Sequence, residues 1–500
     1  MAMKNKPTMA LSELLRDLTS NPIDIKDCKV SDITLDSRQV GPGSVFFALS
    51  GSQQHGLEFA KKAMDQGVAA IIFDPAGKGQ ELANKVTDTI LVKCERLRTK
   101  LGAIADRFYR RPSTKLDVIG CTGTNGKTSC SHFLAQTLND AAVIGTLGWG
   151  DWRQLNKTEN TTPDVLSTHK ILAELVRQRK KAVAIEVSSH GLDQGRVDAV
   201  HFKGALYTRI TRDHLDYHQT MDAYVEAKLK LLQQPGLQFV VFNRQDKYAQ
   251  IIVQNSPLNV QLWGYSVGAA PDLPGYLLLA EDLTHTSKGL SFTVRERQQT
   301  ASLNVPLFGL FNVENALAVM AVLRALGFSF DDAIAEINQL LPVTGRMDMF
   351  KTEALLPTVI IDYAHTPHAL ESVLTSVKDH CQGHIWLIFG CGGDRDEGKR
   401  PMMGIVAEAL SDHVVVTDDN PRNESGDKII EGILAGCKKT TTQVIRGRKE
   451  AIRQVVSLAK KDDIILIAGK GHEGFQEIKG SYIPFNDKAV AYEVMRQEYL

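Results

Sequence analysis

The sequence predicts an α/β protein of three domains, and three observations support this prediction. The chain has 500 residues, which corresponds to about three domains at roughly 150 residues each. Short apolar runs of strand length alternate with longer amphipathic stretches almost throughout, which is the pattern of α/β folds. One strand-to-helix passage carries a glycine-rich loop of the kind that binds phosphates, so we expect a central nucleotide-binding domain with a mainly parallel sheet.

The first part of the chain, residues 1–95, is predicted to be a small α/β domain. Residues 44–49 and 68–73 are apolar and strand-like, and the amphipathic stretch 57–66 between them is a predicted helix. Strand, helix and strand in this order form the basic unit of a parallel sheet.

The middle part, residues 96–342, begins with a predicted strand at 116–120 that leads through the glycine loop into a helix at 128–139. Further strands are predicted at 182–187, 204–208 and 239–243, and a helix at 312–326. Residues 341–345 contain both proline and glycine and mark a domain boundary.

The last part, residues 343–500, is predicted to be a Rossmann-like domain. Its apolar runs, separated by helical stretches, predict strands at 358–363, 385–389, 413–417 and 464–468.

Charge and cysteine content exclude several classes of protein. Lys and Arg total 58, and so do Asp and Glu, so the basic excess of a nucleic-acid or anionic-membrane binder is missing. Seven scattered cysteines without a Cys-x-x-Cys pair predict reduced thiols. No apolar run approaches the ~18 residues of a membrane span, and no signal sequence is recognisable. We therefore expect a cytoplasmic protein that neither binds nucleic acid nor inserts into membranes. We also expect a monomer, although these features do not bear on the oligomeric state.

The glycine loop reads GCTGTNGKT over residues 120–128. Glycines let backbone N–H groups approach phosphate oxygens, and the following helix N-terminus favours negative charge. Lys127 is expected to reach the terminal phosphates of ATP, and Thr128 to reach Mg²⁺. A strict motif has glycine where Cys121 stands, so a plain glycine-rich turn remains the alternative.

Two regions downstream are candidates for metal binding. Glu186 ends an apolar run and so lies at the carboxyl edge of the predicted sheet, where ligands bind in α/β folds. His214 belongs to RDHLDYH, residues 212–218, which is rich in ligand-type side chains. Taken alone, such a segment is also typical of polar surface.

Lys228 lies on the apolar face of a predicted helix over 221–233. A lysine in this position often extends its ammonium to solvent. Partial burial would instead populate the neutral amine, which can react with CO₂ to give a carbamate, an anionic metal ligand.

Four motifs together resemble the Mur ligase family, which makes peptidoglycan precursors by ATP-driven amide formation. They are TGTNGKT (122–128), EVSSHG (186–191), RDHLDYH (212–218) and DYAHTP (362–367). The resemblance covers the whole chain. NTT (160–162), GCGGDRD (390–396) and DNPR (419–422) resemble members that add meso-diaminopimelate to UDP-N-acetylmuramoyl-L-alanyl-D-glutamate. The expected partners are therefore these two small molecules and ATP as co-substrate, with Mg²⁺ as cofactor.

The resemblance also implies roles for individual residues. ATP would be held by Gly123, Thr124, Asn125, Gly126, Lys127, Thr128, Ser129, Asn312, Asn315, Arg346 and Asp362. The catalytic group would be Lys127, Glu186, His214 and Lys228. Mg²⁺ would be held by Thr128, Glu186, His214 and Lys228, the last as N6-carboxylysine.

The other two substrates have their own implied sites. The UDP-muramoyl-dipeptide would contact Leu35, Ser37, Gln53, Asn160, Thr161, Thr162, Ser188, Gln194 and Arg196. The diaminopimelate would contact Arg395, Asp419, Asn420, Pro421, Arg422, Gly469 and Glu473.

Selectivity for the amino acid should rest on charge. Diaminopimelate has a second carboxylate that lysine lacks, and the planar guanidinium of Arg422 can bind it bidentately. Arg395 is expected to bind the other carboxylate, and Glu473 to accept from the distal ammonium. The alternative for Arg422 is a simple ion pair with Asp418 or Asp419.

The chain departs from the family pattern at Ser129, at residues 52–54 and at Arg209. The sequence offers no explanation for Arg209. A folylpolyglutamate synthase would share the loop but not the DNPR motif or the first 95 residues. A GTPase-like switch would need an Asn-Lys-x-Asp string, which the sequence does not contain. A catalytically silent scaffold would not be expected to keep all four catalytic residues.

Overall fold

The computed structural model describes residues 7–18, 27–51, 54–286, 289–351, 356–378, 380–438 and 442–497. The chain forms two compact units. The first consists of Met1–Gly120, Leu138–Ala205 and Ala227–Gln238, and the second of Cys121–Thr137, Leu206–Glu226 and Phe239–Leu500. The predicted boundaries near residues 95 and 342 stay a prediction.

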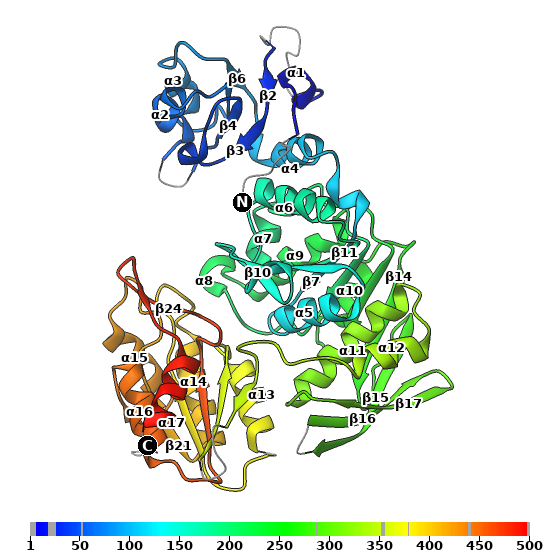
Figure 1. Ribbon diagram of the computed structural model, residues 1–500, viewed down its shortest axis with the longest axis vertical. Coiled ribbons are helices and arrows are strands. Elements are labelled where there is room, and N and C mark those ends of the chain that lie inside the picture. Colours follow the sequence, from blue (N-terminus) through cyan, green and yellow to red (C-terminus); the bar gives the residue numbers. More distant parts are fainter. Residues whose placement is uncertain are drawn as a thin grey trace. The chain divides into compact units, whose positions relative to one another are not determined.

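The first unit begins with a four-stranded parallel sheet in the order β3-β4-β5-β6 (Figure 1). Its strands are β3 (Asp32–Thr34), β4 (Ser44–Ala48), β5 (Ala70–Phe73) and β6 (Leu91–Lys93). Neighbouring residues along β4 and β5 enter two different cores, as the period of two in a strand requires. Around the sheet lie β1 (Met9–Ala10), α1 (Leu11–Leu14), β2 (Lys29–Val30), η1 (Ser37–Gln39), η2 (Gly56–Phe59), α2 (Ala60–Asp65), α3 (Gly79–Ala83), α4 (Leu97–Phe108) and η3 (Pro112–Lys115).

The remainder of the first unit carries strands in the order β10-β9-β8-β11-β7. β8 and β11 are parallel, whereas β9 and β10 form antiparallel pairs. The elements are β7 (Asp117–Thr122), β8 (Ala141–Gly145), β9 (Gly148–Asp151), β10 (Gln154–Asn156), α6 (Val165–Arg177), β11 (Ala182–Glu186), α7 (Ser189–Asp193) and η4 (Lys230–Gln233). Three elements, β7, β12 (Gly204–Tyr207) and α9 (Met221–Leu229), run from one unit into the other along the chain.

The second unit contains a run of strands from β13 to β17, parallel at first and antiparallel from β15 onward. Its buried centre is α11, which is apolar on nearly every side and therefore packs against both strands and helices. The elements are α5 (Lys127–Thr137), α8 (Leu215–His218), β13 (Phe239–Asn243), α10 (Ala249–Asn255), β14 (Gln261–Val267), β15 (Tyr276–Thr286), β16 (Gly289–Glu296), β17 (Gln299–Val305), α11 (Leu310–Ala325) and α12 (Phe330–Ile337).

The second unit ends in a six-stranded sheet of order β18-β19-β23-β20-β21-β22, in which only β18 is antiparallel. Helices α13, α14 and α15 pack on one face, and α16 and α17 on the other (Figure 1). The strands are β18 (Asp348–Phe350), β19 (Thr358–Asp362), β20 (Ile385–Phe389), β21 (His413–Val416), β22 (Gln443–Val444) and β23 (Ile464–Ala468), with an added hairpin of β24 (Phe475–Ile478) and β25 (Ser481–Pro484). The helices are α13 (Pro367–Lys378), α14 (Lys399–Leu410), α15 (Gly426–Leu434), α16 (Arg448–Leu458) and α17 (Asp487–Gln497).

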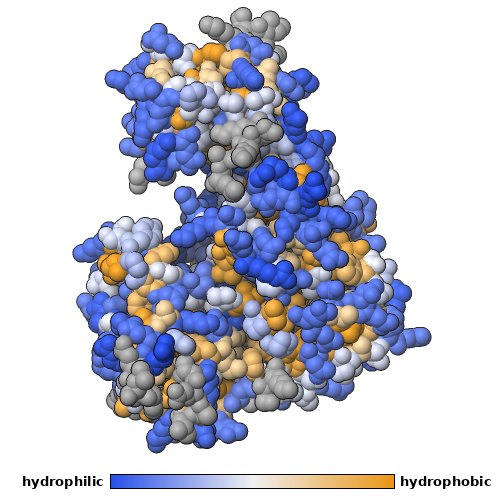
Figure 2. Space-filling model, in the orientation of Figure 1, coloured by the Kyte–Doolittle hydropathy of each residue, from blue (hydrophilic) through white to orange (hydrophobic). Residues whose placement is uncertain are grey.

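The predicted α/β fold is confirmed, and each predicted strand is present to within about two residues. The antiparallel strands β15–β17 were not predicted, because their exposed alternate residues leave no continuous apolar run. Hydrophilic residues cover most of the face in Figure 2, with apolar patches between them. In the part of the chain that the structure describes, no helix has both the length and the apolar character to cross a membrane.

Candidate active site

The glycine loop joins β7 to α5 in a conformation that needs its glycines. Gly123 has a φ of +142° and Gly126 a φ of +88°, backbone angles that residues with a Cβ rarely adopt. A Cβ on Gly123 would collide with the Thr208 hydroxyl, and one on Gly126 would lie 2.6 Å from Asn315 Oδ1. The backbone of the loop therefore lies close to β12 and α11.

Side chains hold the loop from two directions. Lys127 Nζ donates to the carbonyl oxygens of Gly123 and Thr124, at 2.9 and 2.8 Å. Thr208 Oγ1, just beyond β12, donates to the Asn125 carbonyl at 2.6 Å. The lysine charge is thus fixed over the strand-to-helix turn.

Arg346 lies beside the first turn of α5. Its Nη2 donates to Thr128 Oγ1 at 3.0 Å, and its guanidinium lies 4.4 Å from the centre of the Tyr363 ring. Asp362 accepts from two backbone N–H groups at 2.7 Å each, one of them from Met347. Burial raises the pKa of Asp362, although Arg346 and these N–H groups oppose the shift. Asp362 thereby fixes the backbone that carries Arg346.

A small pocket lies next to α5 in the second unit. Its lining residues are Ser129, Phe133, Leu307, Phe308, Asn312, Pro342, Val343, Arg346 and Met347. Asn312 donates to the Phe308 carbonyl at 2.8 Å, and Asn315 donates to Asn312 Oδ1 at 3.0 Å. The structure therefore brings the residues predicted to bind ATP together around one loop and one pocket.

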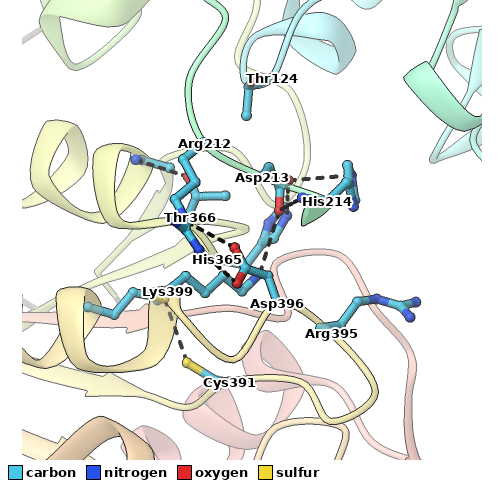
Figure 3. A network of polar contacts seen from close by, with 12 residues as sticks. Thr124, Arg212, Asp213, His214, His365, Thr366, Cys391, Arg395, Asp396 and Lys399 are labelled. Atoms are coloured by element: carbon cyan, nitrogen blue, oxygen red, sulfur yellow. Dashed lines mark hydrogen bonds and ion pairs between the residues drawn. The ribbon is translucent and has the colours of Figure 1, made fainter. Parts of the chain in front are cut away.

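Asp213 is the centre of a polar network (Figure 3). Its carboxylate lies 3.4 Å from Nε2 of His214, 3.6 Å from Nε2 of His365 and 3.8 Å from Nζ of Lys399. Burial opposes ionisation, but the neighbouring His365 and the charges of His214 and Lys399 outweigh it, so the pKa of Asp213 lies well below its usual value. His214, predicted to be catalytic, is thus oriented by a buried carboxylate.

The same network reaches the GCGGDRD loop. Arg212 Nε lies 3.1 Å from Oδ2 of Asp396, whose Oδ1 accepts from Gly398 N at 2.9 Å. Arg395 is exposed and points away from the network (Figure 3), and it donates to the carbonyl of the preceding Asp394 at 2.8 Å. Its predicted contact with a carboxylate stays a prediction.

Glu186 lies at the end of β11 in the first unit and is fully buried. Its carboxylate accepts from the backbone N–H of Thr146 at 2.9 Å and from the Thr146 hydroxyl at 3.1 Å. The same hydroxyl lies 3.1 Å from Oγ1 of Thr161. The two Thr146 donors therefore hold the Glu186 side chain at the carboxyl edge of the strand.

Thr162 links several residues predicted to bind the dipeptide. Its hydroxyl donates to the Glu186 carbonyl at 2.9 Å and lies 3.0 Å from Oγ of Ser188. The Thr162 carbonyl accepts from Arg196 at 2.8 Å, and Arg196 also binds Oε1 of Gln194.

Two further residues predicted to bind the dipeptide belong to the N-terminal sheet and the turn that follows it. Leu35 packs against the core of the N-terminal sheet, and Ser37 begins η1. Asn160 is exposed. Gln53 lies outside the described residues.

Lys228 is 1% exposed at the end of α9. This burial excludes the alternative of an ammonium extended into solvent, whereas the carbamate stays a prediction. Within the described ranges, no group of three or more His, Cys, Asp or Glu side chains is arranged to hold a metal ion. The hydroxyl of Thr128 and the carboxylate of Glu186 are nevertheless oxygen donors of the type that Mg²⁺ prefers.

Two of the residues predicted to bind diaminopimelate contact a buried lysine. Lys470 is fully buried, and its Nζ donates to Asn420 Oδ1 at 2.9 Å and to Glu473 Oε2 at 2.8 Å. Gly469 has a φ of +112°, and a Cβ there would lie 2.5 Å from Asp419 Oδ2. Lys470 was not predicted, although it follows a predicted glycine directly.

Arg422 is bound by groups that the sequence did not indicate. Its Nε lies 3.1 Å from Oε2 of Glu477, and its Nη1 donates to the Gly393 carbonyl at 2.8 Å. The ion pair of Arg422 is thus with Glu477, and Asp418, one of the two aspartates in the alternative, pairs with Arg446 at 3.0 Å.

Pro421 takes part through its backbone. It is buried, and its carbonyl accepts from Glu424 N at 3.0 Å. A Cβ on Gly393 would collide with this carbonyl, so the two loops approach each other closely here.

Further contacts were not predicted from the sequence, because the two partners lie far apart in the chain. Arg209 pairs with Glu314 of α11, with Nε 2.8 Å from Oε2, which accounts for this departure from the family pattern. Thr146 and Thr208 each follow a strand directly. Their position at the carboxyl edge of the sheet was the available signal.

Comparison with known proteins gives consistent matches. Residues 29–109 match the Mur ligase family catalytic domain, residues 121–323 the Mur ligase middle domain, and residues 345–471 the Mur ligase glutamate ligase domain. The UDP-N-acetylmuramoyl-L-alanyl-D-glutamate--2,6-diaminopimelate ligase of Coxiella burnetii is 42% identical over 466 residues, 92% of this chain and 94% of the relative. The ligase of the same name from Xanthomonas campestris pv. campestris is 42% identical over 97% of both chains. A solved structure of an enzyme with this name matches with a TM-score of 0.66 at 32% identity and covers 99% of this chain and 100% of its own.

Proposed function

This chain belongs to the Mur ligase family, and we propose that it is an ATP-dependent amide ligase that adds meso-2,6-diaminopimelate to UDP-N-acetylmuramoyl-L-alanyl-D-glutamate. The observation that carries this proposal is the 42% identity, over nearly the whole length, to ligases named for this reaction. The reaction belongs to peptidoglycan precursor synthesis, and we place it in the cytoplasm, where ATP is available.

We assign the three substrates to the three predicted segments. Residues 1–95 would bind the uridine end, residues 96–342 ATP, and residues 343–500 the diamino acid. The matched family segments at 29–109, 121–323 and 345–471 support this division.

The chemistry activates a carboxylate. The D-glutamate carboxylate attacks the γ-phosphorus of ATP, which releases ADP and leaves an acyl phosphate. The amine of diaminopimelate then attacks the acyl carbon, and phosphate leaves as the amide bond forms. In this proposal the N–H groups of the glycine loop bind the phosphates, and Lys127 and Arg346 neutralise the charge that they carry.

Mg²⁺, when bound, would supply further neutralisation of phosphate charge. The Thr128 hydroxyl and the Glu186 carboxyl group are each of a donor type that Mg²⁺ prefers, and Lys228 would contribute oxygen donors only as the carbamate. Mg²⁺ often keeps several waters and few protein ligands in nucleotide sites, so these residues fit without a cluster of acidic side chains. Because Nε2 of His214 faces Asp213, we assign His214 chiefly to orienting the groups around it.

The proposed function is tested by phosphate release. We expect release by the purified protein only when ATP, UDP-N-acetylmuramoyl-L-alanyl-D-glutamate and diaminopimelate are all present. With lysine, kcat/KM should fall by at least about 100-fold, because the groups that bind the second carboxylate lose their partner. Equal rates with the two amino acids would contradict the assignment of substrate.

Arg422→Ala tests the part of the proposal that concerns selectivity. Losing a bidentate, charge-assisted contact should lower kcat/KM for diaminopimelate by about 100-fold or more. The KM for ATP should change by less than about two-fold, because this arginine does not contact the glycine loop. Unchanged kinetics with diaminopimelate would remove Arg422 from the site.

A further inference from the structure

The β24–β25 hairpin contacts the predicted diaminopimelate residues from outside the motifs. Gln476 Nε2 donates to the carbonyl of Asp419 at 2.6 Å. The next residue, Glu477, donates its backbone N–H to Asn420 Oδ1 at 2.9 Å. Consecutive residues of one strand thus hold consecutive residues of the DNPR motif.

The hairpin also holds the backbone of Arg422. The N–H of Arg422 donates to the Glu477 carbonyl at 3.1 Å, and the N–H of Lys479 donates to the Arg422 carbonyl at 2.8 Å. Arg422 has a φ of +52°, a left-handed conformation that costs free energy in a residue with a side chain. Hydrogen bonds on both sides of this residue maintain the conformation.

The guanidinium of Arg422 is oriented by two contacts. Glu477 Oε2 binds Nε at 3.1 Å, and the Gly393 carbonyl accepts from Nη1 at 2.8 Å. A Cβ on Gly392 would lie 2.8 Å from Nη1, so a glycine there makes room for the group. A guanidinium has five N–H donors, and these contacts use one on Nε and one on Nη1. The edge formed by Nη1 and Nη2 remains for a carboxylate.

Arg422 and Glu477 also neutralise each other's charge where both side chains are partly buried. The side chains of Arg422 and Glu477 are 19% and 23% exposed. A half-buried guanidinium without a counter-charge would be unfavourable before the amino acid binds. Glu477 supplies that counter-charge at Nε.

We propose that Glu477 is a specificity-determining positioning residue, which fixes Arg422 through Nε so that the Nη1–Nη2 edge meets the second carboxylate of the incoming diamino acid. This inference rests on the proposed function and deepens it. Glu477 acts on the substrate only through Arg422.

The first experiment compares Glu477→Ala and Glu477→Gln in the full-length protein. We expect Glu477→Ala to raise the KM for diaminopimelate about ten-fold, the loss of one well-placed charge-assisted hydrogen bond. Glu477→Gln keeps an acceptor for Nε and should stay within about three-fold of the wild type. In both variants kcat and the KM for ATP should change by less than about two-fold, because the glycine loop is untouched.

A matched control is Glu281→Ala in β15. Glu281 forms an ion pair with Arg295 of β16 at 2.7 Å, also across a hairpin but outside the predicted site. We expect Glu281→Ala to leave all kinetic constants unchanged. Thermal unfolding of the three variants shows whether they fold alike.

A second substrate tests whether the effect passes through Arg422. The probe is diaminopimelate in which the carboxylate predicted to face Arg422 is an amide. Glu477→Ala should leave the KM for this amide unchanged. A similar rise in KM for the amide, or for ATP, would show a merely structural role and overturn the inference. If the wild type used diaminopimelate and Glu477→Ala matched it, only this inference would fail, whereas a wild type that ignored diaminopimelate would defeat the proposed function as well.

Discussion

The glycine loop and the diaminopimelate region are both predicted to bind an anionic ligand, but they differ in how they present positive charge. The loop uses backbone groups and a lysine from consecutive residues, and Lys127 contacts the loop from which it projects. The diaminopimelate region gathers charged side chains from several segments, and Lys470 and Arg422 are already paired with Glu473 and Glu477. A local motif can present positive charge directly, whereas an assembled site must balance its charges among its own residues.

The largest effect that tests this comparison is expected at the loop. Lys127→Ala removes the charge that neutralises the terminal phosphates, so kcat should fall by about 1,000-fold or more. Because Lys127 donates to carbonyl oxygens of the loop from which it projects, the unfolding temperature should change by less than about 2 °C. Phosphate release and thermal unfolding measure the two quantities. A large loss of stability with little loss of rate would reverse the comparison.

Lys470→Met tests the opposite expectation for the assembled site. It leaves Glu473 and Asn420 without their buried cationic partner, so the free energy of unfolding should fall by about 3 kcal/mol. The KM for diaminopimelate should rise as well, because both residues lose their orientation. Urea unfolding followed by circular dichroism measures the first effect. Lys488→Met, which breaks the more exposed pair with Asp348, should cost less than about 1 kcal/mol.

The same contrast explains how much could be predicted from sequence. The predicted strands and the glycine loop follow from periodicity and spacing within a few residues of each other, so local patterns were sufficient for them, whereas β15–β17 have no continuous apolar run. The partners of Arg422, Arg209 and Asp213 lie 55, 105 and 152 residues away in the chain. Long-range ion pairs leave no local pattern, and for this reason Glu477, Glu314 and His365 were not predicted.

Two histidines with lowered pKa values, one near each region, predict part of the dependence of stability on pH. Burial, with the charge of Arg346, lowers the pKa of His132 on α5 to about 4, and burial, with Arg346, His132 and Lys470, lowers that of His472 to about 3. The unfolded chain binds a proton at each below about pH 6.5, whereas the folded chain does not. The contribution of each histidine to the free energy of unfolding is therefore fully present above pH 6.5. It is lost as the pH falls from 6.5 toward the pKa of that histidine in the folded chain. At pH 5 the loss should be about 2 kcal/mol for each histidine.

His472→Gln checks this prediction. The variant should lose about 2 kcal/mol of the decrease in the free energy of unfolding between pH 7 and pH 5, which is the contribution of one such histidine. Urea unfolding at several pH values gives the slope. A slope identical to that of the wild type would mean that His472 titrates alike in the folded and unfolded chain.

Arg209→Ser should have the smallest effect. It tests whether the glycine loop depends on the ion pair between Arg209 and Glu314. The carbonyl of Arg209 accepts from the N–H of Thr124 in the glycine loop at 2.8 Å, while its side chain pairs with Glu314. The backbone contact survives the substitution, so the KM for ATP should rise by no more than about three-fold. Glu314 is left partly buried without its cation, which should cost about 1 kcal/mol, because the arginine is about one-third exposed. Arg209→Ser combined with Glu314→Gln should recover part of that loss in thermal unfolding. A ten-fold rise in the KM for ATP would show instead that this distant ion pair sets the position of the loop, and that even the local motif depends on an assembled charge pair.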